Sequence, residues 1–164
     1  MTLLILYIAL AIGISFLCSM LEAVLLRITP TFTATIEEKK PRVASRIRQL
    51  KDDIDRPLSA ILSLNTIAHT VGAAGAGAQA QIVFGDAAVT GFSAVLTFLI
   101  LVLSEIIPKT LGALYWQSFA PAASRILPVL IWVMWPLVKM SQLITVLLSR
   151  GKPQPPVTRE EIVA

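Results

Sequence analysis

The sequence predicts an all-α membrane protein with three transmembrane helices, a juxtamembrane helical hairpin and a belt-like interfacial helix. Of its 164 residues, 55% are hydrophobic and only 15% are charged, whereas a soluble domain carries about 25% charged residues. The charges are concentrated, because residues 27–56 hold 8 of the 14 Lys and Arg residues and 5 of the 10 Asp and Glu residues. Long apolar runs surround this segment. This pattern excludes a water-soluble globular enzyme.

The three expected spans cover residues 3–26, 57–84 and 87–107. At about 1.5 Å per residue, each run makes a helix long enough to cross a hydrocarbon core of about 30 Å. Gly85 and Asp86 form a tight polar turn, so the last two helices are expected to be antiparallel. Pro108 is expected to break or kink the third helix.

The charged residues 27–56 are expected to form a short helical hairpin on the cytoplasmic membrane surface. Val43, Ile47, Leu50 and Ile54 recur at helical spacing and make a narrow apolar stripe. Lys and Arg accumulate in cytoplasmic loops, so this segment sets the orientation of the chain. A plain solvated loop is the alternative interpretation.

A fourth apolar run, residues 126–148, is also long enough to span the membrane. A fourth crossing, however, places the basic residues that follow it on the outer side, against the positive-inside rule. Trp132 and Trp135 suit a membrane interface. We therefore expect a bent belt helix over about residues 123–149 on the inner boundary and a cytoplasmic C-terminus, with a fourth span as the alternative.

Several polar side chains lie inside the apolar runs, where an ionisable group costs about 2.5–3.5 kcal/mol and needs a partner or a function. They are Ser15, Ser19 and Glu22 in the first run, Asn65 and His69 in the second, and Glu105 in the third. Carboxylate, amide and hydroxyl oxygens suit hard cations such as Mg²⁺, Ca²⁺ or Na⁺. These residues predict an intramembrane cation site.

Most of these residues also have a structural interpretation. Serines such as Ser15 often bond only their own helix backbone. Glu22 lies near the inner end of its run, where it can snorkel or pair with Lys109 instead of binding an ion. His69, the only histidine, can be a packing group, a proton carrier or a ligand. Glu105 is the hardest to explain without a cation.

Two further features concern the backbone: one belongs to the predicted site, and the other predicts how the helices pack. A break at Pro108, followed by Lys109, Thr110 and Gly112, frees carbonyl oxygens that a bound cation can satisfy. The small-residue run 72–78 predicts close helix–helix contact, within one chain or across a dimer, with a flexible kinked stretch as the alternative.

The motifs of several other function classes do not appear in the sequence. It has no phosphate-binding loop, no His-Glu-x-x-His motif and no Ser/His/Asp arrangement, so we expect no enzyme. The net charge of +4 is explained by the cytoplasmic flank of a membrane protein, so no nucleic-acid partner is expected.

Three segments resemble the transmembrane domain of the CorC / cyclin M (CNNM) family of magnesium transport proteins. Residues 16–23 are similar to the family pattern F-S-x-x-E-x-A, and residues 64–69 are similar to its G-N-x-x-x-N. Residues 104–110, with the sequence Ser-Glu-Ile-Ile-Pro-Lys-Thr, are similar to its G-E-x-x-P-K-[ST] and are the most specific match. Residues 151–164 resemble the linker to a cytoplasmic cystathionine-β-synthase-type (CBS) domain.

The resemblance implies a homodimer in the plasma membrane that exports Mg²⁺ in exchange for Na⁺. It implies that residues 1–150 form the membrane domain. The implied metal ligands are the side chains of Ser19, Asn65 and Glu105 and a backbone carbonyl near Gly112. Glu22 and His69 are further candidates, on their own chemistry and not on the resemblance. Pro108, Lys109 and Thr110 would form the helix-break motif.

The sequence departs from this pattern at several positions. His69 replaces the second asparagine, and an imidazole is a poorer Mg²⁺ ligand than an amide oxygen. Leu64 and Ser104 replace glycines, and Ala23 stands where many relatives carry a hydroxyl group. Two alternatives to Mg²⁺ export therefore stay open: export of another divalent cation, and a regulatory or ion-sensing protein that does not transport.

Overall fold

The computed structural model describes residues 1–149, which are helical almost throughout and contain no strand. The helices are α1 (Thr2–Arg27), α2 (Pro30–Glu37), α3 (Pro41–Asp52), α4 (Asp55–Phe84), α5 (Asp86–Leu99), η1 (Ile100–Ile106), α6 (Ile107–Leu114), α7 (Trp116–Val133) and α8 (Trp135–Ser149). The all-α prediction is confirmed for this part of the chain. The expected linker, residues 151–164, lies outside the described residues.

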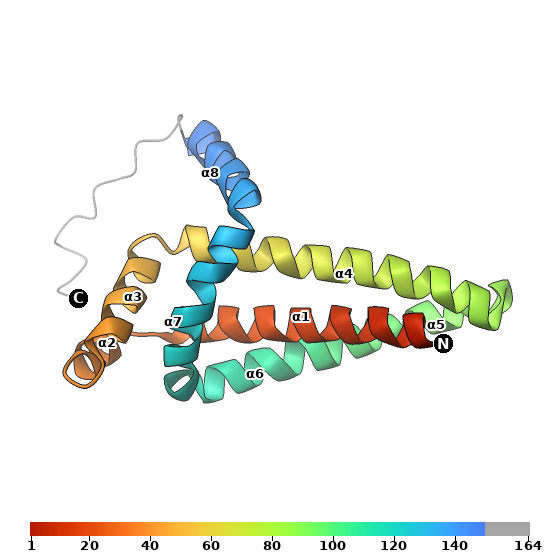
Figure 1. Ribbon diagram of the computed structural model, residues 1–164, viewed down its shortest axis with the longest axis horizontal. Coiled ribbons are helices and arrows are strands. Elements are labelled where there is room, and N and C mark those ends of the chain that lie inside the picture. Colours follow the sequence, from red (N-terminus) through yellow and green to blue (C-terminus); the bar gives the residue numbers. More distant parts are fainter. Residues whose placement is uncertain (150–164) are drawn as a thin grey trace, which may run out of the picture.

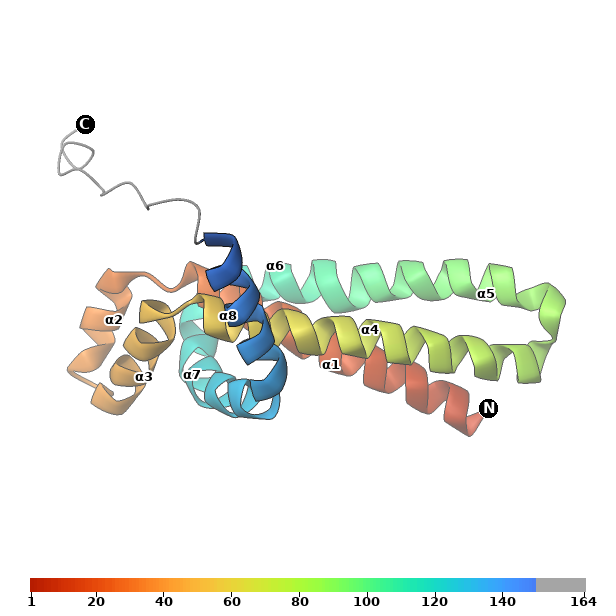
Figure 2. The same ribbon diagram turned by 90° about the horizontal axis from the view of Figure 1, so that it is seen from above.

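Three long helical rods lie side by side, formed by α1, by α4 and by α5, η1 and α6 together (Figures 1 and 2). α4 runs antiparallel to α1, and the third rod returns in the direction of α1. The turn between α4 and α5 is Gly85, whose φ of 80° is a left-handed conformation that favours glycine. The expected antiparallel pair is therefore present.

Two of these helices are long and apolar enough to cross a membrane, namely Thr2–Arg27 and the continuous helix Asp86–Leu114. A third candidate arises if Trp116–Val133 and Trp135–Ile144, which are bent by 81°, form one span. The expected second span, residues 57–84, lies within the 30-residue α4 but is not among these candidates by composition. Its many glycine, alanine and polar residues give α4 less apolar character than its neighbours.

Small residues let α4 approach α1 closely. A Cβ atom added at Gly72 would lie 2.3 Å from the Ala11 Cβ, and one added at Gly75 would lie 2.5 Å from the Tyr7 ring. The predicted helix–helix contact of the small-residue run is confirmed within one chain. The helix is continuous through this run.

The third rod differs from the expectation at Pro108, because the helix continues through this residue to Leu114. Just before the proline, η1 adopts π-helical geometry, and the Ile107 N–H donates to the Val102 carbonyl. A proline ring clashes with the carbonyl four residues earlier in an α-helix, and a π-helical turn relieves that clash by widening the helix. The helix is therefore not broken at Pro108, and the residues just before it form a locally wider turn.

α7 and α8 cover the region expected to form the belt helix. α7 begins at Trp116 rather than near residue 123, and it continues through Pro121 and Pro128. It crosses the bundle of long helices at a steep angle, and the chain then bends into α8 (Figure 1). The expected bend is present, and the expected start of the helix is wrong.

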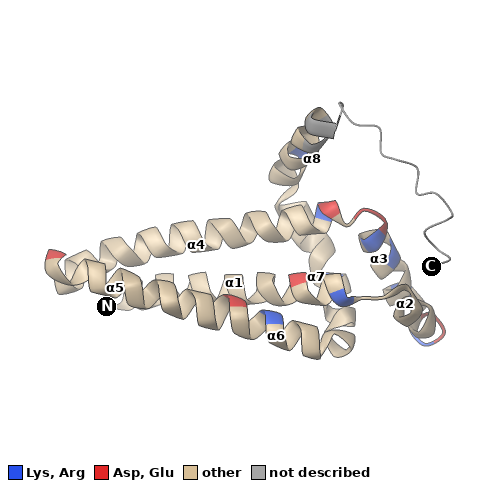
Figure 3. Cartoon of the chain, turned by 180° about the vertical axis from the view of Figure 1, so that it is seen from behind, with Lys and Arg blue, Asp and Glu red and all other residues tan. Residues whose placement is uncertain are grey.

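α2 and α3 form two short helices at one end of the bundle, so the prediction of helices in this segment is confirmed and the plain loop is wrong. Thr29 caps α2 by accepting a hydrogen bond from the Phe32 N–H at 3.3 Å. The buried residues of α3 include Val43 and Ile47, as its apolar stripe predicts. Lys and Arg gather around these helices, as Figure 3 shows.

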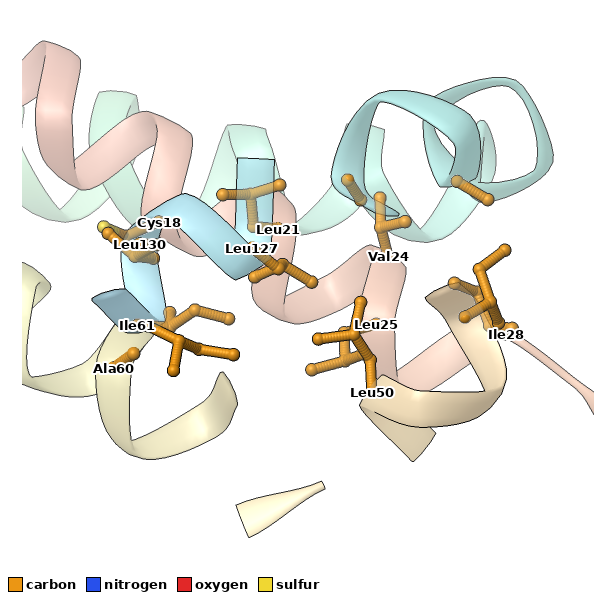
Figure 4. Packing of buried hydrophobic residues seen from close by; sticks show 14 of the residues in the cluster. Cys18, Leu21, Val24, Leu25, Ile28, Leu50, Ala60, Ile61, Leu127 and Leu130 are labelled. Carbon is orange, nitrogen blue, oxygen red and sulfur yellow. The ribbon is translucent and has the colours of Figure 1, made fainter. Parts of the chain in front are cut away.

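The main apolar core lies at the same end of the bundle, where α1, α3, α4 and α7 meet. Leu21 and Leu25 of α1 pack with Ile61 of α4, Leu50 of α3 and Leu127 of α7 (Figure 4). All five side chains are buried. This core fixes the ends of α1 and α4 and thereby the register of the polar residues midway along them.

Candidate cation site

Residues from three helices form a chain of polar contacts in the middle of the bundle. Ser15 Oγ of α1 lies 2.5 Å from His69 Nε2 of α4. On the other side of the ring, His69 Nδ1 lies 3.7 Å from Glu105 Oε1 of η1. The side chains of His69 and Glu105 are 26% and 33% exposed, whereas Ser15 is fully buried. The structure thus brings two predicted site residues together.

The backbone of η1 takes part in the same contacts. The Ser15 hydroxyl donates to the Ser104 carbonyl at 3.5 Å. In an α-helix this carbonyl would accept from the N–H of residue 108, which a proline lacks. The proline therefore leaves an acceptor that a side chain of α1 can reach, and Ser15 bonds across helices rather than to its own backbone.

Ser19 and Asn65 lie one helical turn away from these contacts. Ser19 follows Ser15 by four residues on α1, and Asn65 precedes His69 by four on α4. Because the helices are antiparallel (Figure 1), both steps go in the same direction, and the register brings Ser19 and Asn65 to the same level. Among the described residues, Ser19 Oγ and Asn65 Oδ1 are the buried side-chain polar atoms without a hydrogen-bond partner.

Two unpartnered buried oxygens in one small region are unusual, because most buried polar atoms in proteins are hydrogen-bonded. Both oxygens can accept a hydrogen bond or coordinate a cation. Within the described residues, no three His, Cys, Asp or Glu side chains form a group that could hold a metal ion. The two unpartnered atoms are a hydroxyl oxygen and an amide oxygen, and both are ligand types that suit hard cations.

Gly112 lies further along the third rod, against α1. A Cβ atom added there would lie 2.8 Å from the Met20 carbonyl oxygen and 3.0 Å from the Ala23 Cβ. The missing side chain therefore lets α6 approach α1 closely, and the small Ala23 serves the same contact. The carbonyl-ligand role expected at Gly112 remains a prediction.

Glu22 and Lys109 form an ion pair between α1 and α6, with Nζ 3.3 Å from Oε2. Of the interpretations left open by the sequence, the structure shows pairing. The pair lines a pocket of about 330 Å³ together with the side chains of Ala23, Leu26, Arg27 and Ala113. Thr110 is exposed, and its hydroxyl donates a hydrogen bond to the Ile106 carbonyl of its own helix at 2.8 Å.

Ser15 and Ser104 make contacts between helices that their positions in the sequence do not predict. Ser15 is the residue that connects α1 both to the imidazole of His69 and to the backbone of η1. The signal available in the sequence was the i, i+4, i+7 spacing of Ser15, Ser19 and Glu22, which places them on one face of α1. The contribution of the Ser104 carbonyl depends on the geometry beside Pro108, which spacing does not reveal.

Comparison with known proteins identifies relatives over nearly the whole chain. The UPF0053 protein sll1254 of Synechocystis sp. is 32% identical over 146 residues, which cover 89% of this chain and 42% of the relative. The UPF0053 inner membrane protein YfjD of Escherichia coli is 36% identical over 109 residues, 66% of this chain and 26% of the relative. The chain thus spans less than half the length of these relatives.

A more distant relative comes from a plant. The DUF21 domain-containing protein At1g55930, chloroplastic, of Arabidopsis thaliana is 28% identical over 162 residues, which cover 96% of this chain and 25% of the relative. The model of the family described as "Cyclin M transmembrane N-terminal domain" matches residues 5–164 of this chain. The matched residues include α1 almost completely and all of α4 and η1, which carry the polar side chains described above. The chain therefore belongs to the cyclin M transmembrane N-terminal domain family, with UPF0053 proteins among its relatives.

Proposed function

We propose that this chain is the membrane domain of a transporter that exports Mg²⁺ in exchange for Na⁺, through a site enclosed by α1, α4 and η1. The observation that supports the proposal most strongly is the pair of buried oxygens without partners, Ser19 Oγ and Asn65 Oδ1. They lie on the two helices that carry Ser15 and His69, whose ring faces the Glu105 carboxylate. Family membership adds independent support for a membrane protein with a role in transport.

The energetics favour an ion in this position. A buried polar group without a partner costs about 1–3 kcal/mol. A carboxylate within the membrane costs a further ~2.5–3.5 kcal/mol on insertion scales. A dication between Ser19, Asn65 and Glu105 would offset both terms, because it offers a partner to each oxygen and neutralises the charge. Glu22 and Gly112 would lie at the inner side of this site.

The proposed topology has three crossings. α4 lies alongside α1 for most of its length (Figures 1 and 2), so it would cross the same thickness of bilayer although it is less apolar. The basic helices α2 and α3 would face the cytoplasm, and α7 would lie as a belt on the inner boundary of the plasma membrane. Three crossings then place the C-terminus in the cytoplasm.

The remaining length of the relatives leaves room for further domains. We propose that residues 151–164 lead into a cytoplasmic CBS-type domain of the same full-length chain, and that two copies of the chain form a homodimer in the lipid bilayer. Transport in this scheme moves ions without covalent chemistry, so the protein is proposed to have neither an enzymatic activity nor a nucleic-acid partner.

Ion flux in proteoliposomes tests the proposal. The full-length protein is reconstituted with internal Mg²⁺ and an external Na⁺ gradient, and Mg²⁺ efflux is followed with a fluorescent indicator. Wild-type protein should dissipate the Mg²⁺ gradient when Na⁺ is supplied, and Glu105→Gln should abolish the flux. Glu37→Gln is the matched control, because Glu37 is an exposed carboxylate on α2. Binding without flux in the wild type would instead identify a regulatory protein that does not transport.

A further inference from the structure

We infer that His69 is a direct nitrogen ligand of the cation site, so that the site also accepts Mn²⁺ and holds it more tightly than Mg²⁺. This inference rests on the proposed function, because it specifies the ions taken by the same site. Three observations carry it: the hydrogen bonds of the imidazole, the distance between His69 and Glu105, and the residues that hold the ring in place.

One tautomer of His69 satisfies both contacts of the Ser15 hydroxyl. Ser15 Oγ lies 2.5 Å from His69 Nε2 and 3.5 Å from the Ser104 carbonyl oxygen, and the hydroxyl has a single hydrogen. When Ser15 donates that hydrogen to the carbonyl, the imidazole carries its own hydrogen on Nε2 and donates it to Ser15 Oγ. In this tautomer Nδ1 has a free lone pair, on the side of the ring nearest Glu105. Direct ligation of a cation by Nδ1 requires this tautomer.

A lone pair beside a carboxylate is an arrangement that a cation stabilises. His69 Nδ1 and Glu105 Oε1 are 3.7 Å apart, too far for a direct hydrogen bond. Metal bonds to imidazole nitrogen and carboxylate oxygen are each about 2.0–2.2 Å long, so a single ion can contact both atoms. The side chains of His69 and Glu105 are 26% and 33% exposed, so neither is sealed off by the surrounding protein.

The imidazole is held by fully buried groups. Metal-binding histidines usually donate their second ring N–H to a protein acceptor that fixes the orientation of the ring. In the tautomer that ligation requires, Ser15 Oγ is that acceptor, and the Ser15 hydroxyl in turn donates to the Ser104 carbonyl. Both serines are completely buried. The contacts therefore form a supporting structure for a ligand, with Ser15 as its positioning residue.

A nitrogen ligand changes the preference of the site. Mg²⁺ prefers oxygen ligands and gives up its water reluctantly. Divalent ions of the first transition row bind imidazole nitrogen better, and Mn²⁺ also accepts the carboxylate, hydroxyl and amide oxygens present here. A site with one imidazole among oxygen ligands should therefore favour Mn²⁺ over Mg²⁺.

Pulsed electron paramagnetic resonance of the Mn²⁺-loaded, full-length protein tests direct ligation. The wild type should show coupling of the Mn²⁺ electron spin to an imidazole ¹⁴N nucleus, and His69→Asn should lose that coupling. The absence of ¹⁴N coupling in Mn²⁺-loaded wild type would overturn the inference. Since this measurement needs only the wild type, it tests direct ligation by the imidazole even if a variant fails to fold.

Titration calorimetry with Mn²⁺ and Mg²⁺ tests the preference. In His69→Asn, the ratio of Mn²⁺ affinity to Mg²⁺ affinity should fall by about tenfold or more, since even supporting residues change metal affinity by about 10–100-fold. Ser15→Ala should weaken Mn²⁺ binding more than Mg²⁺ binding. An unchanged ratio in His69→Asn, with Mg²⁺ binding still dependent on Glu105, would refute the inference and leave the proposed function intact. Binding of both ions that is unaffected by Glu105→Gln would refute the proposed function itself.

Discussion

The apolar core around α7 differs from the polar centre of the bundle, which comprises Ser15, Ser19, Asn65, His69 and Glu105. In the core, aliphatic side chains from α1, α3, α4 and α7 fill the space between the helices (Figure 4). In the polar centre, Ser19 and Asn65 present oxygens that have no partner. The core therefore holds the helices together, whereas the centre leaves two polar groups unsatisfied, which under the proposed function is the cost of keeping them for an ion. Substitutions in the two regions should therefore have opposite effects.

The largest effect is expected from a truncation in the core. Leu127 is fully buried on α7, and Leu127→Ala should reduce the free energy of unfolding by about 2–5 kcal/mol because it leaves a cavity. Thermal unfolding in detergent measures this loss. Val129→Ala is the control, since Val129 is 60% exposed on the same helix. An equal loss in both variants would contradict the assignment of the core.

A smaller loss is expected where α4 touches α1. Gly72→Ala places a methyl group 2.3 Å from the Ala11 Cβ, so the helices must separate, at a cost of about 1–3 kcal/mol. The same unfolding measurement applies. Gly77→Ala is the matched control, because a Cβ atom there meets nothing within 4 Å. It should be neutral or stabilising, given the higher helix propensity of alanine. A loss of stability in Gly77→Ala as large as in Gly72→Ala would refute the close contact.

In the polar centre, a substitution should leave the free energy of unfolding unchanged or raise it, the opposite of its effect in the core. Ser19→Ala removes a buried oxygen without a partner, so without divalent ions its free energy of unfolding should stay equal or rise by about 1 kcal/mol. Ser124→Ala is the control, because the buried Ser124 hydroxyl donates to the Pro121 carbonyl at 2.8 Å. That variant should lose about 0.5–1.5 kcal/mol. Equal losses in the two variants would show that Ser19 already has a partner.

The smallest effect is expected outside both regions, at the ion pair between Glu37 and Arg48. The hydrogen bond from Arg48 lowers the pKa of Glu37 below its usual value. A lowered pKa in the folded state gives stability that is present above the unfolded pKa, about 4.3, and is lost as the pH falls through the folded value. The thermal midpoint should therefore decrease slightly more between pH 5 and pH 3 in wild type than in Glu37→Gln. Identical pH dependence would show that the pair contributes nothing.

The sequence predicted the long helices and most of the polar centre because the signals are local. Apolar runs set the helix lengths, and four-residue spacing put Ser15 and Ser19 on one face of α1 and Asn65 and His69 on one face of α4. The run around Gly72 predicted close contact because small residues permit it at any register. These features need no knowledge of the tertiary structure.

The features that escaped prediction depend on neighbouring helices. Pro108 was expected to break or kink its helix, but there is no break, and a π-helical turn and the approach of Ser15 accommodate the proline. α7 starts at Trp116, earlier than the expected start near residue 123, and it passes through Pro121. Prolines are tolerated within membrane-protein helices where neighbouring groups satisfy the freed backbone. Sequence spacing does not show such neighbours.

The proposal that the polar centre is a cation site is tested most directly by thermal unfolding of wild type and the Ser19→Ala, Asn65→Leu double variant, with and without MgCl₂. Ion binding to the folded state raises stability, by about 2.7 kcal/mol at one hundred times the dissociation constant. Wild type should therefore unfold at a higher temperature in MgCl₂, and the double variant should not respond, although without the ion it should be at least as stable as wild type. A double variant that responds to MgCl₂ as strongly as wild type would contradict the proposed site.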